Sequence, residues 1–303
     1  MKHIFIFNPQ AGGGIGEKKY LPEIMKAVKS ANLDYEIHRS LGAAEITSYV
    51  KRKCEEGGDV RFYALGGDGT VHDVMSGLAC QKNAQLAIIP CGTGNDFVKN
   101  WTNCKNTNIE DAINGTVISI DAVKYGDSYS INMINIGADC DVVVEAGKIE
   151  QFHGAINYLI GALKILPKGP VYKMRYSIDD GEEIEGDFLL MCIANGQFCG
   201  GGFKSCPKAS INDGYIDLCL VKPVGGLEII PLMMKYRTGA HLTHPKTQEL
   251  LIYKKCKKFK LTAIEPVNVS NDGEVSEFTS AEFEIVPNAI NLVIPRGSEL
   301  IYK

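Results

Sequence analysis

Short apolar runs alternate with helical segments along the first third of the chain, and this alternation constrains the fold more than any other feature. The expected strands are His3–Phe7, Tyr35–His38, Val60–Leu65 and Leu86–Ile89. The expected helices are Tyr20–Ala31, Ala43–Glu55 and Val71–Leu78. This order predicts a parallel sheet with helices on its faces. In such sheets, ligands bind beside the carboxyl ends of the strands.

The pattern changes near Asp121, where strand-like runs follow one another: Ala122–Tyr125, Ser130–Ile136, Tyr172–Ile178, Phe188–Ala194, Tyr215–Val221, Phe259–Ala263 and Glu282–Val286. Helical stretches at Ile156–Leu166 and Leu227–Tyr236 interrupt them. These runs predict an antiparallel β-sandwich domain with helical insertions. We therefore expect two domains: an α/β domain of residues 1–121 with a C-terminal return of residues 290–303, which includes the run Asn291–Ile294, and a β-sandwich domain of residues 122–289.

The composition excludes several classes of protein. A formal net charge of −4 argues against a general nucleic-acid binder. No apolar run is long enough to span a membrane, and the short apolar start leads into Asn8-Pro9 as a strand and not as a signal peptide. The ten cysteines show no metal-ligand spacing, and we interpret them as core residues in a reducing compartment. We therefore expect a cytoplasmic protein.

Three glycine-rich loops, Asn8–Gly14, Gly66–Thr70 and Pro90–Asp96, each follow an expected strand of the first domain. Glycine lets backbone N–H groups approach phosphate oxygens, because no Cβ stands in the way. A single loop of this kind is often an ordinary turn, but three at one end of a sheet indicate a phosphate site. The P-loop and dinucleotide fingerprints are both missing from the sequence, so the site is of another type.

Asp68 and Asp96 lie inside these loops, where bound phosphates would repel them. Their position makes chemical sense if Mg²⁺ lies between the carboxylates and the phosphates. The alternative is that each aspartate only caps the helix that follows it.

Gly66–Thr70 followed by Gly92–Phe97 resembles the catalytic domain of the diacylglycerol and sphingosine kinase family, and the soluble bacterial diacylglycerol kinases in particular. Similar second-domain motifs are Asn195-Gly196, Gly200-Gly201-Gly202, Pro207-Lys208-Ala209, Asp213-Gly214-Tyr215 and Asn271-Asp272-Gly273-Glu274. The resemblance covers nearly the whole chain. It implies an ATP-dependent lipid kinase, with diacylglycerol as the expected substrate and phosphatidic acid as the expected product.

The resemblance also implies roles for individual residues. The expected ATP-site residues are Asn8, Pro9, Gln10, Ala11, Gly12, Ser40, Gly66, Gly67, Asp68, Gly69, Thr70, Val71, His72, Thr93 and Asn95. Asp68, Asp96 and Asp121 would organise a catalytic Mg²⁺, partly through water. A second, structural Mg²⁺ would be held by Asp213 and by backbone carbonyls near Ser210 and Tyr215. Either Asp272 or Glu274 would act as the general base, and the sequence leaves this choice open.

The chain departs from the family pattern at one position of the first loop. Some relatives place a lysine directly after the first loop's glycine, where this chain has Gly13. Lys18 and Lys19 are the nearest cations that follow. Ser40 stands where relatives have Thr, which keeps the hydroxyl.

A diacylglycerol's hydroxyl stays at the bilayer surface, so a kinase that uses it must associate with the membrane peripherally. The apolar helical stretches at 156–166 and 227–234 are candidates for acyl-chain contact, with burial in the core as the alternative. Lys254, Lys255, Lys257, Lys258 and Lys260 form a basic run that would attract anionic lipid, or would protect an edge strand. The oligomeric state is open, and a homodimer remains an option.

Two other functions compete with the lipid kinase. A kinase of a soluble metabolite, such as an NAD kinase, uses a loop similar to Gly66–Gly69. A non-catalytic sensor of lipid or nucleotide would keep the fold without the reaction, although every expected carboxylate is present.

Overall fold

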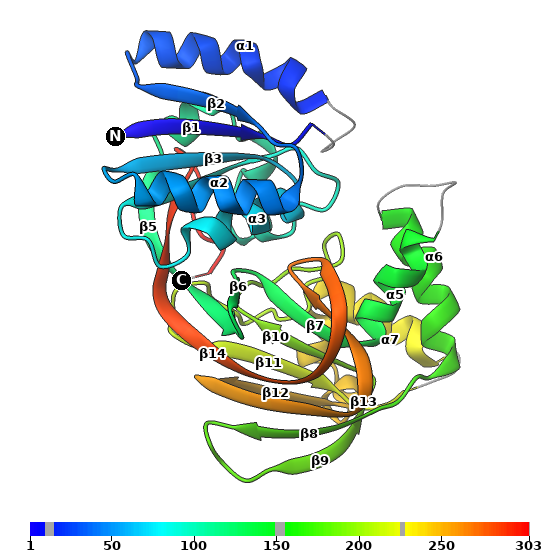
Figure 1. The fold of residues 1–303 in the computed structure, drawn as a ribbon. Coiled ribbons are helices and arrows are strands. Elements are labelled where there is room, and N and C mark those ends of the chain that lie inside the picture. The colour runs from blue at the N-terminus through cyan, green and yellow to red at the C-terminus, as the bar shows by residue number, and fades with distance from the viewer. Residues whose placement is uncertain (10–14, 149–154, 225–227, 303) are drawn as a thin grey trace. The chain divides into compact units, whose positions relative to one another are not determined.

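Two compact units make up the chain (Figure 1). The computed structural model describes residues 1–9, 15–148, 155–224 and 228–302. The first unit comprises Met1–Ala122 and Pro287–Lys303, and the second comprises Val123–Val286. The strands β5 (Thr116–Tyr125) and β14 (Glu274–Ile294) each contain residues of both units.

A parallel sheet with helices on both faces forms the first unit. Its strands are β1 (Lys2–Phe7), β2 (Tyr35–Arg39), β3 (Val60–Gly66), β4 (Ala84–Pro90) and the last part of β14, in the order β14-β4-β3-β1-β2. All four pairings between these neighbours are parallel, including that of Asn291–Val293 with Gln85–Ala87. The expected parallel α/β fold is confirmed.

The helices of this unit are α1 (Ile15–Ser30), α2 (Ala43–Glu55), α3 (Asp68–Leu78) and the short α4 (Ile109–Ile113). Tyr20, Ile24 and Val28 of α1 pack against Phe5 and Tyr63 of the sheet. The helices α2 and α3 cover the opposite face (Figure 1). Because both faces are covered, every residue of β3 is buried, as is typical of a central parallel strand.

The second unit is an antiparallel β-sandwich with helical insertions, as the sequence predicts. Its further strands are β6 (Ser128–Ser130), β7 (Met133–Gly137), β8 (Tyr172–Ile178), β9 (Ile184–Phe188), β10 (Leu190–Ala194), β11 (Ile216–Val221), β12 (Leu251–Cys256) and β13 (Lys258–Asn271). Neighbours in the order β12-β11-β10-β7-β13-β14 pair antiparallel, and β8 joins β13 to β9. The interior is an apolar cluster that includes Ile134, Ile193, Leu218, Phe259 and Phe283.

The helices of the second unit are α5 (Ala138–Gly147), α6 (Ala155–Ile165), α7 (Ile229–Thr238) and α8 (Pro245–Gln248). Two of them, α6 and α7, correspond to the expected helical stretches. Within the described residues, no helix combines the length and apolar character that a membrane-spanning segment needs.

Several expected strand boundaries were wrong. The run Ser130–Ile136 is divided into β6 and β7, because the amides of Ile131 and Asn132 donate to the side chain of Asp272 instead of to a strand. The run Phe188–Ala194 is divided at Leu189, whose amide donates to Val221 and whose carbonyl accepts from Ala138. The separate runs 282–286 and 291–294 are parts of the one long strand β14.

The boundaries between the two units lie at residues 122/123 and 286/287. The boundaries expected from the sequence were 121/122 and 289/290. The helices α4, α5 and α8 and the strands β9 and β12 match no expected segment. Two of these, α4 and β9, are only five residues long, so each gives a short periodic pattern.

Candidate active site

Glycine-rich loops meet at one edge of the parallel sheet in the first unit. The strands β1, β3 and β4 end at Phe7, Gly66 and Pro90, and their parallel register aligns these ends. The amide of Cys91 donates to the Gly66 carbonyl over 2.8 Å, and Asn8 Nδ2 donates to Thr70 Oγ1 over 3.1 Å. Of the first loop only Asn8 and Pro9 are described, so the expected ligands Gln10, Ala11 and Gly12 lie outside the described residues.

Backbone packs directly against backbone where the second and third loops touch. A Cβ built on Gly92 would lie 2.4 Å from Gly67 Cα. A Cβ on Gly94 would lie 2.8 Å from Asp68 Oδ2. Both distances are shorter than the contacts that Cβ atoms make in proteins. Any other residue at these two positions would therefore displace the neighbouring loop or carboxylate.

Asp68 and Asp96 are brought together by this packing. Asp68 Oδ1 accepts the amides of Asp96 and Phe97 over 2.7 and 3.3 Å. Asp96 is buried, and its Oδ1 pairs with Lys99 Nζ over 2.5 Å, while the same ammonium donates to the Gly94 carbonyl over 2.8 Å. Burial, together with the charge of Asp96, raises the pKa of Asp68 to about 6. The pair therefore carries more negative charge than Lys99 neutralises, and this donor set fits a hard divalent cation.

Lys99 was missed by the sequence analysis, although its spacing three residues after Asp96 is a signal that could have found it. In the structure it is the cation that holds Asp96 and the third loop.

Without a bound metal, Asp68→Asn is expected to stabilise the protein above pH 6. In the folded protein the pKa of the Asp68 carboxyl is about 6, above the usual 3.8, so the folded state binds the carboxyl proton more tightly than the unfolded state does. The contribution of the protonated Asp68 carboxyl to the free energy of unfolding is fully present below about pH 4 and is lost as the pH rises through 6. Removing the charge should raise the free energy of unfolding at pH 8 by about 1–3 kcal/mol. Denaturant unfolding in EDTA measures this, with the exposed Asp59→Asn as a charge-matched control expected to change little. Equal effects of the two substitutions across the pH range would contradict the assignment.

Ser40 follows β2 and holds a buried hydroxyl. Its amide donates to the Phe7 carbonyl over 2.9 Å, but Ser40 Oγ has no hydrogen-bond partner among the described residues. A buried hydroxyl without a partner is unfavourable, so this atom fits contact with a polar ligand at the ends of β1 and β2.

The other expected ligands of the first unit have varied surroundings. Asn95 stabilises its own loop, accepting from the Gly92 amide and donating to the Gly92 carbonyl. Thr93 is exposed, His72 is partly buried, and the Val71 side chain lies in the core. Asp121 is buried in β5, where its Oδ1 accepts the amide of Asn288 over 2.9 Å. This contact fixes Asp121 beside β14.

In the second unit, Asp272 and Gly273 form the two-residue turn between β13 and β14. Both have positive φ, 48° and 105°, as a tight hairpin requires. The Asp272 side chain is buried, and its Oδ1 accepts from Ser130 Oγ over 2.6 Å and from the Met133 amide over 2.9 Å. Together with the amides of Ile131 and Asn132, these donors hold the carboxylate in place. Glu274, by contrast, is exposed.

At the expected structural metal site, the Asp213 carboxylate has partners within the described residues. Asp213 Oδ1 accepts the Tyr215 amide, and its Oδ2 pairs with Lys255. Ser210 Oγ donates to Asn212. The Lys255 ammonium also lies 3.5 Å from Asp217 Oδ2, so a cation already compensates these carboxylates. Among the described residues, no three His, Cys, Asp or Glu side chains converge as metal ligands, either around Asp213 or around Asp68 and Asp96. The structural Mg²⁺ at Asp213, Ser210 and Tyr215 stays a prediction.

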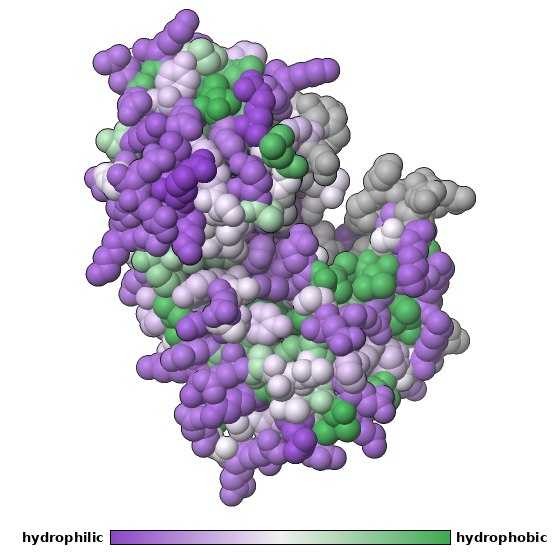
Figure 2. Space-filling view, in the orientation of Figure 1, coloured by the Kyte–Doolittle hydropathy of each residue, from purple (hydrophilic) through white to green (hydrophobic). Residues whose placement is uncertain are grey.

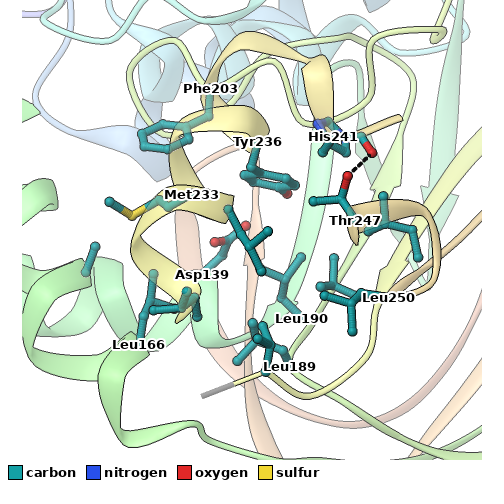
Figure 3. A pocket seen from close by; sticks show the side chains of 16 residues that line it. Asp139, Leu166, Leu189, Leu190, Phe203, Met233, Tyr236, His241, Thr247 and Leu250 are labelled. Carbon is teal, nitrogen blue, oxygen red and sulfur yellow. Dashed lines mark hydrogen bonds between the residues drawn. The ribbon is translucent and has the colours of Figure 1, made fainter. Parts of the chain in front are cut away.

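An apolar pocket with a cavity volume of about 70 Å³, partly open to solvent, lies on the helical side of the second unit (Figure 3). Its lining includes Ala162 of α6, Leu166 directly after α6, and Ile229, Leu232, Met233 and Tyr236 of α7. Both helical stretches that the sequence suggested for acyl-chain contact therefore line one pocket. Strand residues such as Leu190 and Leu251 complete the wall. The carboxylate of Asp139 lies among Met233, Tyr236 and Leu190 as one of few polar groups (Figure 3).

The basic run at 254–260 is largely neutralised. Lys255 pairs with Asp213, while Lys258 and Lys260 both contact Asp180 and Glu282. Lys254 and Lys257 are exposed, and the Lys257 ammonium lies 5.7 Å from the Tyr215 ring centroid. Three of the five charges that would attract an anionic membrane are therefore already compensated.

Known proteins similar to this chain are kinases. Residues 2–125 match the diacylglycerol kinase catalytic domain, and residues 132–294 match the YegS C-terminal NAD kinase beta sandwich-like domain. The diacylglycerol kinase of Staphylococcus carnosus is 28% identical over 98% of this chain and 97% of its own length. That of Bacillus subtilis is 27% identical over 96% of this chain and 95% of its own length.

Solved structures agree at the level of the fold. The crystal structure of a diacylglycerol kinase from Bacillus anthracis strain Sterne superposes with a TM-score of 0.71 at 22% identity, covering 97% of each chain. An NAD kinase from Archaeoglobus fulgidus in complex with ATP superposes with a TM-score of 0.53 at 12% identity, covering 98% of this chain and 94% of that one. The matches over both units, together with the paired aspartates in the glycine loops, show that the chain belongs to the kinase family that joins the diacylglycerol kinase catalytic domain to the YegS-type β-sandwich domain.

Proposed function

We propose that this protein transfers the γ-phosphate of ATP to the hydroxyl of a lipid, with diacylglycerol as substrate and phosphatidic acid as product. The observation that favours a lipid over a soluble acceptor is the apolar pocket lined by α6 and α7. An apolar pocket with few polar groups suits an acyl chain, whereas a nucleotide acceptor would need many more polar partners. The curated relatives named diacylglycerol kinase support the same acceptor.

In this proposal the first unit, residues 1–122 with 287–303, is the ATP-binding domain. The backbone amides of the second and third loops and the Ser40 hydroxyl bind the phosphates. Asp68 and Asp96 hold Mg²⁺, which when bound neutralises phosphate charge and favours transfer. Lys99 keeps Asp96 and the Gly94 carbonyl in position. Asp121 is proposed to act on the same cation through water.

The second unit, residues 123–286, is the proposed lipid domain. Asp272 and Glu274 lie on the same hairpin, but Glu274 is exposed whereas Asp272 is buried. We assign the general base to Glu274, because its carboxylate is accessible to an acceptor hydroxyl. Asp272 instead positions the hairpin through its hydrogen bonds to Ser130 and the amides of residues 131–133.

A transfer assay with γ-labelled ATP tests the function. Purified protein is incubated with diacylglycerol, monoacylglycerol, ceramide, sphingosine, phosphatidylglycerol or NAD, and labelled products are separated by thin-layer chromatography. Label in phosphatidic acid supports the proposal. Label only in NADP would identify a metabolite kinase, and ATP binding without transfer to any acceptor would identify a sensor.

Narrowing the pocket is expected to discriminate against long acyl chains. Met233→Trp adds bulk beside Tyr236 and Asp139, so the KM for a long-chain diacylglycerol should rise about tenfold, equivalent to roughly 1.4 kcal/mol of lost apolar contact. The KM for a short-chain diacylglycerol should change little. Met75→Leu, in the core of the first unit, is a control for general effects of methionine replacement. Equal losses for both chain lengths would argue that the pocket does not hold the acyl chain.

A further inference from the structure

Exposed apolar side chains adjoin the pocket on two of its helices. Leu163 directly follows the pocket residue Ala162 and is 49% exposed. Met234 directly follows the pocket residue Met233 and is 54% exposed. Hydrophobic side chains also appear among polar ones over α5 and its neighbouring helices (Figure 2). Large apolar groups beside a pocket commonly mark an interaction surface.

The segments that contain α6 and α7 carry a positive charge, unlike the whole chain. Residues 155–168 and 228–251 together carry five cationic side chains and two anionic ones, a formal charge of +3, while the chain carries −4. The cations are Lys164, Lys168, Lys235, Arg237 and Lys246. Lys168, Lys235 and Lys246 form no ion pair with any residue that the structure describes. By contrast, Lys255, Lys258 and Lys260 of the basic run each form an ion pair with an aspartate or a glutamate.

We propose that the outer surface of α6, residues 166–168 and α7 docks on an anionic bilayer, with Leu163 and Met234 inserted at the interface and Lys168 and Lys235 against lipid headgroups. This inference rests on the proposed lipid kinase function and names the surface that serves it. Uncompensated lysines beside exposed apolar groups match an anionic membrane, because attraction to headgroups and apolar insertion reinforce each other. A lipid that leaves the bilayer here meets the apolar pocket without crossing water.

The test compares binding of the full-length protein to phosphatidylcholine vesicles with and without phosphatidylglycerol, by flotation. Lys168→Glu/Lys235→Glu should lower binding to the anionic vesicles at least about tenfold. The control Lys254→Glu/Lys257→Glu makes the same charge change on the basic run and should alter binding less than about twofold. Leu163→Glu/Met234→Glu should reduce binding to both kinds of vesicle.

Phosphorylation of a short-chain diacylglycerol dissolved below its micelle concentration should stay near wild type in all three variants. A larger loss in the control than in Lys168→Glu/Lys235→Glu would overturn the proposal, as would wild-type vesicle binding by all variants. A change of molecular mass in solution for Leu163→Glu/Met234→Glu, with vesicle binding unaltered, would show a contact between copies of the chain and contradict membrane docking. If wild-type protein binds anionic vesicles but phosphorylates no lipid, the proposed function fails while the docking surface stands.

Discussion

Asp68→Asn is expected to lower phosphoryl transfer by about a thousandfold, equivalent to roughly 4 kcal/mol of lost transition-state stabilisation, while the fold is retained. Asparagine keeps an oxygen that can accept the amides of Asp96 and Phe97, so the third loop should stay in place. What is lost is the charge. One carboxylate, Asp96, would remain, and Lys99 already neutralises it.

The measurement is kcat with diacylglycerol over a range of Mg²⁺ concentrations, together with a thermal melt. We expect the variant to melt no lower than wild type, because the charge it removes is unfavourable in the metal-free fold. Asp59→Asn, exposed in the same unit, should have wild-type kcat. Near-normal turnover of Asp68→Asn at saturating Mg²⁺ would show that this carboxylate does not hold the cation.

Glu274→Gln is expected to reduce kcat by about 10²–10⁴ with little change in stability, since it removes an exposed proton acceptor. Asp272→Asn should behave differently. Its amide nitrogen would face donors, namely Ser130 Oγ and backbone N–H groups, so the hairpin should be destabilised by about 1–3 kcal/mol. The two variants therefore separate a chemical role from a positioning role on one turn.

Kinetics and unfolding experiments on both variants test this assignment. Glu277→Gln changes another exposed carboxylate of β14 and should leave both quantities unchanged. If Asp272→Asn lost turnover without losing stability, and Glu274→Gln kept full turnover, the base would be Asp272.

Much of the fold was predictable because the signals are local. The helix Ala43–Glu55 and the strand Tyr172–Ile178 have the bounds expected from local apolar patterns and from the glycines at 57 and 58. The glycine loops after β3 and β4 were recognisable because each follows a short buried strand. Their alignment at one edge then follows from parallel pairing.

Other features were not predictable, because they depend on residues far apart in the sequence. The break at residues 131–132 exists because Asp272, about 140 residues later, accepts those amides. The interpretation of the lysines at 255–260 as a membrane-attracting run omitted their partners Asp180, Asp213 and Glu282, which lie in other segments. The apolar pocket likewise combines side chains from position 139 to position 251.

By itself, the sequence determined the α/β and β-sandwich architecture and the kinase motifs, since periodicity and glycine spacing act over a few residues. Only the tertiary structure decided which charges stay uncompensated. In the structure, the Asp68–Asp96 pair carries more negative charge than nearby cations compensate, and Glu274 is exposed. Asp272 is buried, and Asp213 pairs with Lys255. The reason is physical: the free energy of a charge depends on its burial and its nearest partner, and both are set by packing between distant segments.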